Sequence, residues 1–278
     1  MIDEIIKNCL AEDIGEADHS SLSCVPVDAS GSAKLLVKEE GIIAGVELAE
    51  RIFKHYDSNL KFEKIRSDGD AVAYGDIVFK VSGNSRSILA TERLVLNFMQ
   101  RMSGIATKTH YLSGIIEEYN TTLLDTRKTT PGIREIEKWA VRIGGGVNHR
   151  MGLYDMIMLK DNHIDYAGGV SKAIEATHDY LEKNNQNLKI EIEVRSEEEL
   201  KEVLQSKRVD RIMLDNFTPS RIIEVKDLIP SDIEIEASGG IDEDTLLDYA
   251  KTGVDFISMG ALTHSVKSLD MSLKADFN

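Results

Sequence analysis

The sequence predicts an α/β protein in which a mixed N-terminal part precedes a parallel barrel of alternating strands and helices. Its 278 residues suit two modest domains, or one barrel with an appendage. The first hundred residues combine short strands with short helices, whereas short apolar strands alternate with helical stretches after residue 120. Such alternation gives parallel strands, and six or more units favour closure into a barrel.

In the N-terminal part, apolar spacing predicts a helix over 2–10 and another over 45–56. Three stretches show the alternation typical of strands: 33–38, 62–65 and 77–81. A longer helical pattern over 88–119 links the two parts. We expect this helix to break at Ser103-Gly104, because glycine weakens a helix interior.

The remaining chain carries the barrel. The predicted strands cover 122–125, 155–159, 189–194, 211–214, 233–237 and 255–259. The predicted helices between them cover 170–182, 197–205, 219–228 and 243–251. Ser196, with Glu199 three residues later, and Asp242 are predicted to cap two of these helices.

The charge pattern limits the kinds of partner. A net charge of −15 argues against nucleic acid or an anionic membrane. The segment 125–164 nevertheless has seven Lys or Arg against five Asp or Glu, which leaves a net charge of −17 on the rest of the chain. A local basic pocket in an acidic protein indicates a small, multiply anionic ligand. The longest apolar runs are far too short to span a membrane.

The two cysteines give an indication of the cellular compartment. Cys9 and Cys24 form no CxxC pair, so we expect reduced cysteines in a cytoplasmic protein and no zinc site. We expect no signal peptide, because Asp3, Glu4 and Lys7 interrupt the first turns.

Charged or small residues stand at every predicted barrel strand end, where the active sites of such barrels lie. They are Asp125 with Arg127 and Lys128, Lys160-Asp161, Glu191 with Glu193, Asp215-Asn216, Ser238-Gly239-Gly240, and Gly260-Ala261. The alternative is a barrel core that holds a few paired charges. A buried charge costs folding free energy and is rarely kept unless it serves a function, so we favour an active site at these strand ends.

The glycines after the last two strands predict a phosphate site. Ser238-Gly239-Gly240 and Gly260-Ala261 offer backbone N–H groups that a phosphate can approach closely. The alternative for the first triplet is a simple turn. Gly144-Gly145-Gly146 lacks the GxGxxG spacing of a dinucleotide fingerprint.

The acids Glu193 and Asp215 are suited to bind sugar hydroxyls, to hold Mg²⁺ through water and to stabilise developing positive charge. Their alternative role is a structural ion pair. The bases Arg127, Arg150 and Lys160 are suited to grip carboxylates.

Other polar residues of this region fit a structural role as well as, or better than, a role in ligand binding. We expect Arg134, Lys138 and Arg142 on a helix surface. His163 and His264 fit a hydrogen-bonding scaffold as well as a ligand contact.

The motifs DTRKTTPG, GGGVNHR, LKDNH, LDN, EASGG and GALTHS, in this order, closely resemble the quinolinate phosphoribosyltransferase family. The resemblance extends to ATER followed by LNFMQRMSGIAT, and to EDIGEADHSS, so it covers essentially the whole chain. It implies an N-terminal open α/β sandwich over 1–105 and an incomplete (β/α) barrel over 106–266. The final segment, 267–278, is expected to return to the N-terminal domain.

The family's reaction is implied in the same way. Its members are type II phosphoribosyltransferases that convert quinolinate and phosphoribosyl pyrophosphate to nicotinate mononucleotide, pyrophosphate and CO₂ with Mg²⁺, a step of de novo NAD synthesis. They work as homodimers, in which the N-terminal domain of one subunit closes the barrel mouth of the other.

The resemblance assigns roles to matching residues. Quinolinate-binding groups match Arg127, Lys128, His149, Arg150 and Lys160, with Arg93 supplied across the dimer. Ribose and Mg²⁺ acids match Glu193 and Asp215; phosphate contacts match Ser238, Gly239, Gly240, Gly260, Ala261 and His264. Lys128 and Lys160 are candidates to hold the departing carboxylate or to protonate the ring carbon.

Three alternatives compete with this interpretation. A paralogous type II phosphoribosyltransferase acting on another anionic acceptor is disfavoured, since the full basic set serves a second carboxylate. A non-catalytic phosphate sensor would select against Glu193 and Asp215 in its pocket. A flavin- or phosphosugar-binding barrel enzyme would not need the DTRKT and NHR elements.

Overall fold

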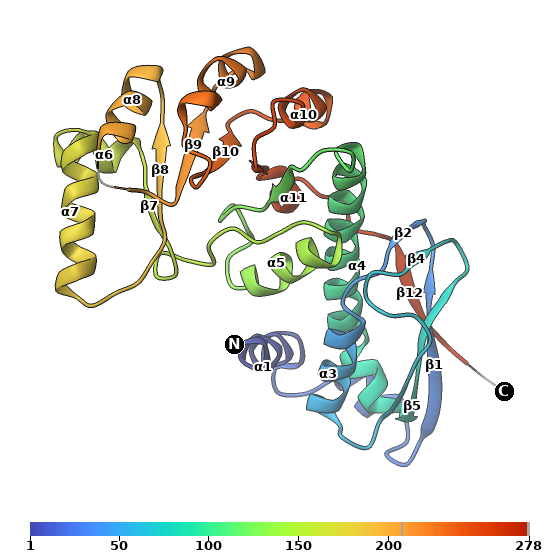
Figure 1. Ribbon diagram of the computed structural model, residues 1–278. Coiled ribbons are helices and arrows are strands. Elements are labelled where there is room, and N and C mark those ends of the chain that lie inside the picture. Colours follow the sequence, from blue (N-terminus) through green and yellow to red (C-terminus); the bar gives the residue numbers. More distant parts are fainter. Residues whose placement is uncertain (207, 277–278) are drawn as a thin grey trace. The chain divides into compact units, whose positions relative to one another are not determined.

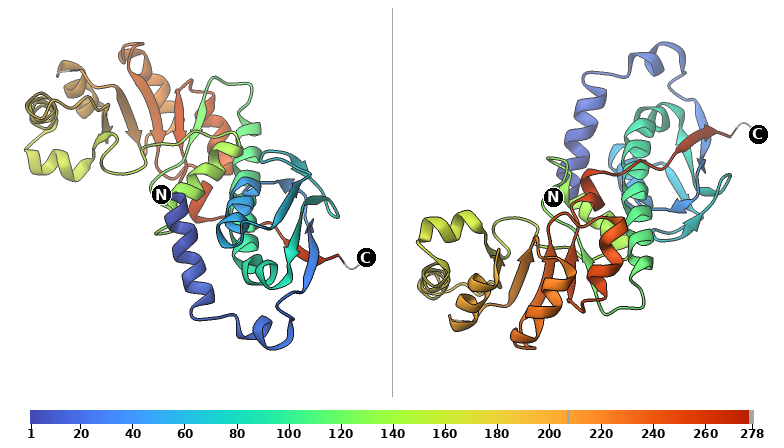
Figure 2. Two further views of the ribbon diagram at one scale, coloured as in Figure 1. Left: turned by 90° about the horizontal axis from the view of Figure 1, so that it is seen from below. Right: turned by 90° about the horizontal axis from the view of Figure 1, so that it is seen from above.

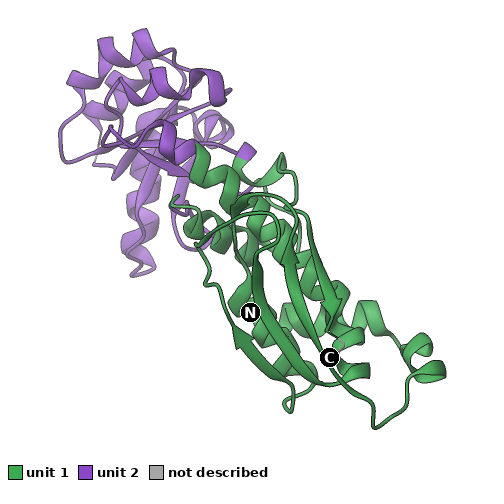
Figure 3. Ribbon diagram, turned by 90° about the vertical axis from the view of Figure 1, so that its right-hand side faces the viewer, with its two compact units in different colours: residues 1–111, 128–146, 262–278 green, residues 112–127, 147–261 purple. Residues whose placement is uncertain are grey.

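A computed structural model describes residues 1–206 and 208–276. The chain forms two compact units (Figure 3). The first unit contains 1–111, 128–146 and the residues from 262 onward, and the second contains 112–127 and 147–261. The expected domain boundary after residue 105 lies inside a helix, and the chain passes between the units more than once.

The first unit contains an antiparallel sheet with the order β12-β1-β5-β3. Its strands are β1 (Ser30–Val37), β3 (Lys61–Lys64), β5 (Ile77–Asn84) and β12 (Met271–Ala275). A further pair joins β2 (Gly41–Ile42) to β4 (Ala71–Val72). The chain therefore returns at its end to the N-terminal sheet, with Val37 opposite Met271 (Figures 1 and 2). Residues 277 and 278 of the predicted returning segment lie outside the described residues.

The helices of this unit are α1 (Ile2–Ile14), α2 (His19–Cys24), α3 (Val46–Tyr56), α4 (Ser85–Ile115) and α5 (Arg134–Ile143). The core includes the fully buried Phe53 and Phe79. The ring of the half-buried Phe62 packs against both, and the three ring centroids lie 4.6–6.1 Å apart. Helix α2 begins at His19 because the Asp18 side chain accepts a hydrogen bond from the Ser21 amide.

The predicted break at Ser103-Gly104 is wrong, because α4 is continuous through both residues. Ser103 Oγ donates to the Ala44 carbonyl and accepts from the Ala44 amide, which ties the helix to the chain beside it. Position 104 leaves no room for a side chain, because the Lys267 carbonyl packs against the glycine backbone. The glycine therefore permits a close approach rather than a kink.

The predicted exposure of Lys138 is also wrong. Helix α5 buries Ile136, Glu137 and Lys138 in succession, so packing covers more than one of its faces. Arg142 is exposed as expected, and Arg134 is half-buried.

The second unit contains a parallel six-stranded sheet with the order β6-β11-β10-β9-β8-β7. Its strands are β6 (Thr122–Leu124), β7 (Ile157–Leu159), β8 (Ile190–Val194), β9 (Arg211–Asp215), β10 (Glu234–Ser238) and β11 (Phe256–Ser258). Among the described residues the edge strands β6 and β7 do not pair with each other, so the predicted incomplete barrel is confirmed.

Connecting helices follow the strands as expected (Figure 1). They are α6 (Asp161–Ala167), α7 (Val170–Lys183), α8 (Glu197–Gln205), α9 (Pro219–Val225) with a 3₁₀ turn (Lys226–Leu228), α10 (Glu243–Ala250) and α11 (Ala261–His264). The predicted caps are confirmed, since Ser196 accepts from the Glu199 amide and Asp242 from the Thr245 amide. None of the described helices combines the length and hydrophobicity that a membrane span requires.

The two faces of the parallel sheet differ in polarity. Residues such as Ile192, Ile212 and Ala237 form one face and are fully buried. The other face carries acidic and basic residues, because strands with the sequences IEIEV, RIMLD and EIEAS alternate apolar and polar positions. The register places Glu191 beside Arg211, and Glu193 beside Met213. The charged face therefore belongs to the interior of the barrel.

The close approach at Gly104 predicts the outcome of a substitution. Gly104→Ala should destabilise the protein by about 1–3 kcal/mol, because the added Cβ meets the Lys267 backbone. Gly114→Ala is the matched control in the same helix, since nothing lies within 4 Å of its added Cβ. Denaturant unfolding of both variants measures the difference. Equal stabilities would contradict the packing described for Gly104.

Candidate active site

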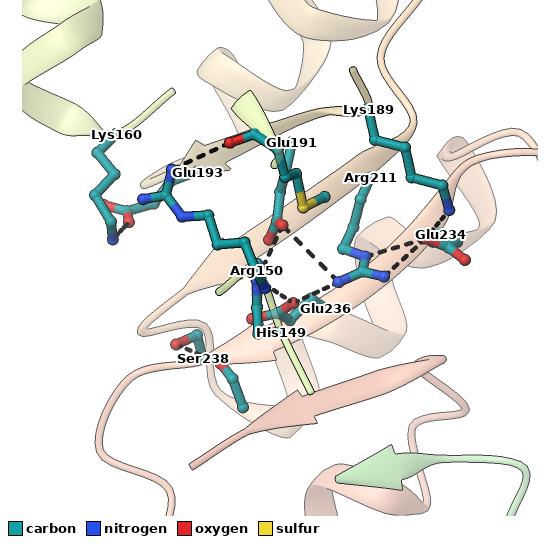
Figure 4. Close-up of polar contacts among 12 residues, drawn as sticks. His149, Arg150, Lys160, Lys189, Glu191, Glu193, Arg211, Glu234, Glu236 and Ser238 are labelled. Carbon is teal, nitrogen blue, oxygen red and sulfur yellow. Dashed lines mark hydrogen bonds and ion pairs between the residues drawn. The ribbon is translucent and has the colours of Figure 1, made fainter. Parts of the chain in front are cut away.

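The carboxyl ends of the parallel strands bring three predicted site residues together. Lys160 follows β7, Glu193 lies on β8 and Asp215 ends β9. Lys160 Nζ lies 2.7 Å from Glu193 Oε2 (Figure 4). Burial and the neighbouring charge of Glu193 raise the pKa of Asp215, while Lys160 acts in the opposite direction. The edge therefore holds two mutually repelling carboxylates with one ammonium group beside them.

The next strand ends hold the predicted phosphate loop. Ser258 Oγ on β11 donates to Ser238 Oγ on β10 at 3.0 Å. Gly239 has a φ of +97°, and a Cβ there would lie 2.8 Å from the Asn216 amide nitrogen. The glycine is therefore required by both backbone conformation and space. Gly240 is exposed, whereas Gly260 and Ala261 are half-buried after β11.

Asp125 organises the segment before Arg150, a role that the sequence alone does not reveal. This fully buried carboxylate accepts from the His149 amide at 2.8 Å and from Asn148 Nδ2 at 2.6 Å. It follows β6 and so anchors the Asn148–Arg150 segment to the sheet. Its position directly after an apolar strand was the available clue.

His149 points into the barrel interior, with a side chain that is 4% exposed. Its Nε2 lies 3.0 Å from Glu191 Oε2 and 3.4 Å from Glu236 Oε2, and its Nδ1 accepts from the Arg150 amide at 2.6 Å (Figure 4). Burial lowers the pKa of His149, but the hydrogen bonds and charges of Glu191 and Glu236 outweigh burial and raise this pKa to about 9. Nδ1 accepts a hydrogen bond, and Nε2 faces two carboxylates. Both contacts indicate that Nε2 carries a proton.

Arg127 and Arg150 belong to the same unit. Burial lowers the pKa of Arg150, and so does the positive charge of Arg127. Arg127 is exposed, whereas Arg150 is half-buried and donates from Nη1 to the Met156 carbonyl at 3.4 Å. Because like charges repel, this pair favours a bound anion.

Three predicted site residues belong to the first unit. Arg93 is exposed on α4. The Lys128 carbonyl accepts from Thr263 Oγ1 at 2.8 Å, and His264 Nδ1 lies 2.7 Å from Ser265 Oγ. His163, which the sequence left undecided, accepts from the Lys160 amide at 3.0 Å and so acts as a scaffold for that residue.

An ion pair in the first unit supports the loop that carries Lys128, and sequence reasoning missed it. The buried Glu137 pairs with Arg101 Nη2 at 2.8 Å and accepts from the Thr130 amide at 3.0 Å. Arg101 also donates to the Thr263 carbonyl. The run REIEKWA places Glu137 among apolar helix positions, which was the available clue.

The fold and the strand ends define a class of protein: an incomplete parallel α/β barrel whose glycine-containing and charged strand ends are suited to anionic ligands.

Comparison with known proteins gives the family. The sequence profile described as "Quinolinate phosphoribosyl transferase, N-terminal domain" matches residues 18–103, and the corresponding C-terminal profile matches residues 105–274. The carboxylating nicotinate-nucleotide pyrophosphorylase of Arabidopsis thaliana is 47% identical over 98% of this chain and 82% of its own length. A probable enzyme of the same name from Bacillus subtilis is 41% identical, over 97% and 92%.

The structural comparison agrees. The crystal structure of NadC from Streptococcus pyogenes is 39% identical and matches with a TM-score of 0.93 over 100% of this chain and 97% of its own. The chain belongs to the quinolinate phosphoribosyltransferase family, which confirms the resemblance seen in its motifs.

The raised pKa of His149 predicts a pH dependence of stability. A folded-state pKa of about 9 against the ordinary 6.5 gives a stabilisation that is complete below pH 6.5 and lost as the pH rises through 9. The free energy of unfolding should fall by up to about 3 kcal/mol over this range. Denaturant unfolding at both ends of the range measures the loss. His149→Gln should flatten the profile, and parallel profiles for the two proteins would contradict the assignment.

Proposed function

We propose that this protein transfers the phosphoribosyl group of phosphoribosyl pyrophosphate to quinolinate, with loss of CO₂. The products are nicotinate mononucleotide and pyrophosphate, and the reaction serves de novo NAD synthesis. Membership of the family supports the reaction. The observation that carries it at the site is the 2.7 Å contact of Lys160 Nζ with Glu193 Oε2 at the strand ends, in the unit that also holds Asp215, Arg127 and Arg150.

Quinolinate brings two carboxylates, and each needs a cationic partner when it leaves water. Arg127 and Arg150 each offer a planar fork for bidentate contact, and Lys160 offers a point charge. Lys160 already pairs with Glu193, so it can exchange that partner for a substrate oxygen without becoming a buried unpaired charge.

The transfer step breaks the bond between the anomeric carbon and pyrophosphate and forms the bond to the pyridine nitrogen. Positive charge develops on the ribose as pyrophosphate leaves. Glu193 and Asp215 stabilise this charge, because both carboxylates are fixed at adjacent strand ends before the reaction begins. Ser238, Gly239, Gly240, Gly260 and Ala261, with His264, hold the phosphates of the donor.

Mg²⁺ fits this acid pair. Burial raises the pKa of Asp215, and the negative charge of Glu193 beside it raises this pKa further. A divalent cation relieves the repulsion between the two carboxylates. Carboxylate oxygens are the ligands that Mg²⁺ prefers, and Asp215 and Glu193 would hold it, in part through water. When bound, the ion neutralises the charge of the departing pyrophosphate.

Decarboxylation follows from the product of the transfer. The pyridinium nitrogen lies next to the carbon that bears the departing carboxylate, so it stabilises the electron pair that CO₂ leaves behind. That carbon then takes up a proton. Lys128 and Lys160 are the candidate proton donors, and either ammonium group also suits the departing carboxylate.

The assembly belongs to the same proposal. We propose a homodimer in which Arg93 of one subunit completes the quinolinate pocket of the other, consistent with its exposure on α4. We also propose a cytoplasmic location, for which two free cysteines, Cys9 and Cys24, are suited.

The test is an assay of the purified full chain with phosphoribosyl pyrophosphate and Mg²⁺, following nicotinate mononucleotide and CO₂ together. Quinolinate should give both products in equal amounts, whereas nicotinate should react at least about tenfold less efficiently because one carboxylate contact is missing. Omission of Mg²⁺ should lower the rate. Turnover of a different anionic acceptor, with none of quinolinate, would overturn the proposal in favour of a paralogous phosphoribosyltransferase.

A further inference from the structure

The ion pair of Arg101 on α4 with Glu137 on α5 contacts two further segments of the first unit. We name them the acceptor segment, residues 128–130, and the donor segment, residues 263–266. We propose that the ion pair couples these two segments, so that groups for the two substrates keep a fixed position relative to each other. Arg101 and Glu137 are then positioning residues.

The two segments serve different substrates in the proposed function, on which this inference rests. Lys128 in the acceptor segment is assigned to the quinolinate carboxylate that departs, and His264 in the donor segment is assigned to the phosphates of the donor. The acceptor segment follows β6 in the chain and the donor segment follows β11, and these strands are neighbours in the parallel sheet. A device that couples the segments therefore concerns both halves of the reaction.

Glu137 holds the acceptor segment. Its side chain is fully buried, and both carboxylate oxygens accept hydrogen bonds. Oε1 accepts from Thr130 Oγ1 at 2.8 Å, and from Arg101 Nε at 3.0 Å and Nη2 at 2.8 Å. Oε2 accepts from the Thr130 amide at 3.0 Å. The carboxylate thus restrains the backbone of the acceptor segment as well as a side chain.

Arg101 extends the same contact to the donor segment. Its Nη2 also donates to the Thr263 carbonyl, and its Nη1 donates to the Val266 carbonyl at 3.4 Å. A guanidinium presents its donors in a rigid plane, so these hydrogen bonds fix the donor segment relative to Glu137. A lysine has one nitrogen on a flexible stem and cannot span these partners in the same way.

A direct hydrogen bond closes the circuit. Thr263, which is fully buried, donates from Oγ1 to the Lys128 carbonyl at 2.8 Å. The acceptor and donor segments therefore contact each other directly and are also joined through Arg101 and Glu137. Because the contacts form a closed ring, displacement of one segment breaks bonds to the other.

The competing explanation is that the ion pair only stabilises the first unit. Desolvation offsets much of the attraction within a buried ion pair, so such a pair is weak evidence for a role in stability. Most of the other partners in this network are backbone groups of the two segments. The explanations differ in outcome, because lost stability loosens the whole unit, whereas lost coupling loosens the two segments together.

Hydrogen exchange of the substrate-free full chain tests the coupling. Arg101→Lys keeps the charge and loses the planar fork, so exchange should become about tenfold faster in both segments and stay unchanged in β1 of the same unit. Arg51→Lys is the matched control, since Arg51 pairs with Asp3 of α1 at 2.6 Å, and it should leave both segments at the wild-type rate. Faster exchange in one segment only, in neither, or throughout the unit would overturn the proposal.

Steady-state kinetics test whether the coupling serves the reaction. Arg101→Lys should raise the KM values for quinolinate and for phosphoribosyl pyrophosphate, each roughly tenfold. In a Lys128→Ala background it should raise the KM for quinolinate by less than about twofold, because the group that it positions is absent, while the KM for the donor still rises. In a His264→Ala background the pattern should reverse. Independent effects on both KM values in both backgrounds would contradict the coupling.

Thr263→Val carries the test if Arg101→Lys does not fold, since it keeps the ion pair and removes only the hydroxyl that joins the segments. Exchange should become about threefold faster in both segments, and wild-type rates would count against the proposal. A wild-type protein that does not use quinolinate would overturn the proposed function alone. The exchange rates of the substrate-free chain would still show whether the two segments move together.

Discussion

The structure depends on one constraint: charged side chains lie inside the barrel, and each must find an opposite charge there. Arg211, on a central strand, meets this constraint by pairing with Glu236 and Glu234 and by approaching Glu191. Removing a single partner would leave a buried charge uncompensated, which costs several kcal/mol. The parallel register sets these residues side by side, so the same backbone hydrogen bonds that build the sheet also assemble the charges.

This interior cluster connects the fold to the strand edge. Glu191 and Glu193 stand two residues apart on β8 and so share a face; the first meets His149 and the second meets Lys160. The His149–Glu191 contact thus lies deeper in the barrel, and the Lys160–Glu193 contact lies nearer the carboxyl ends of the strands. Rigid strands carry both, which suits a site that must hold two anionic substrates in a fixed geometry.

The sequence alone predicts the strands and helices of this arrangement, but it does not predict the contacts between residues that are far apart in the chain. Alternation of strands and helices located the six strands and their order along the chain, because each pattern is local. It could not predict that Gly104 lies inside a continuous helix, because the Lys267 carbonyl that requires this glycine comes from far along the chain. For the same reason Glu191, Arg211 and Glu236 were recognisable as strand residues but not as one cluster. The inward orientation of His149, toward Glu191 and Glu236, depends on this cluster.

The most direct test of this account is a crystal structure of the full chain with quinolinate bound. We predict that the carboxylates of quinolinate contact the guanidinium groups of Arg127 and Arg150 and the ammonium group of Lys160. Quinolinate bound away from these three cationic groups would contradict the claim that the strand ends of the barrel form the substrate site.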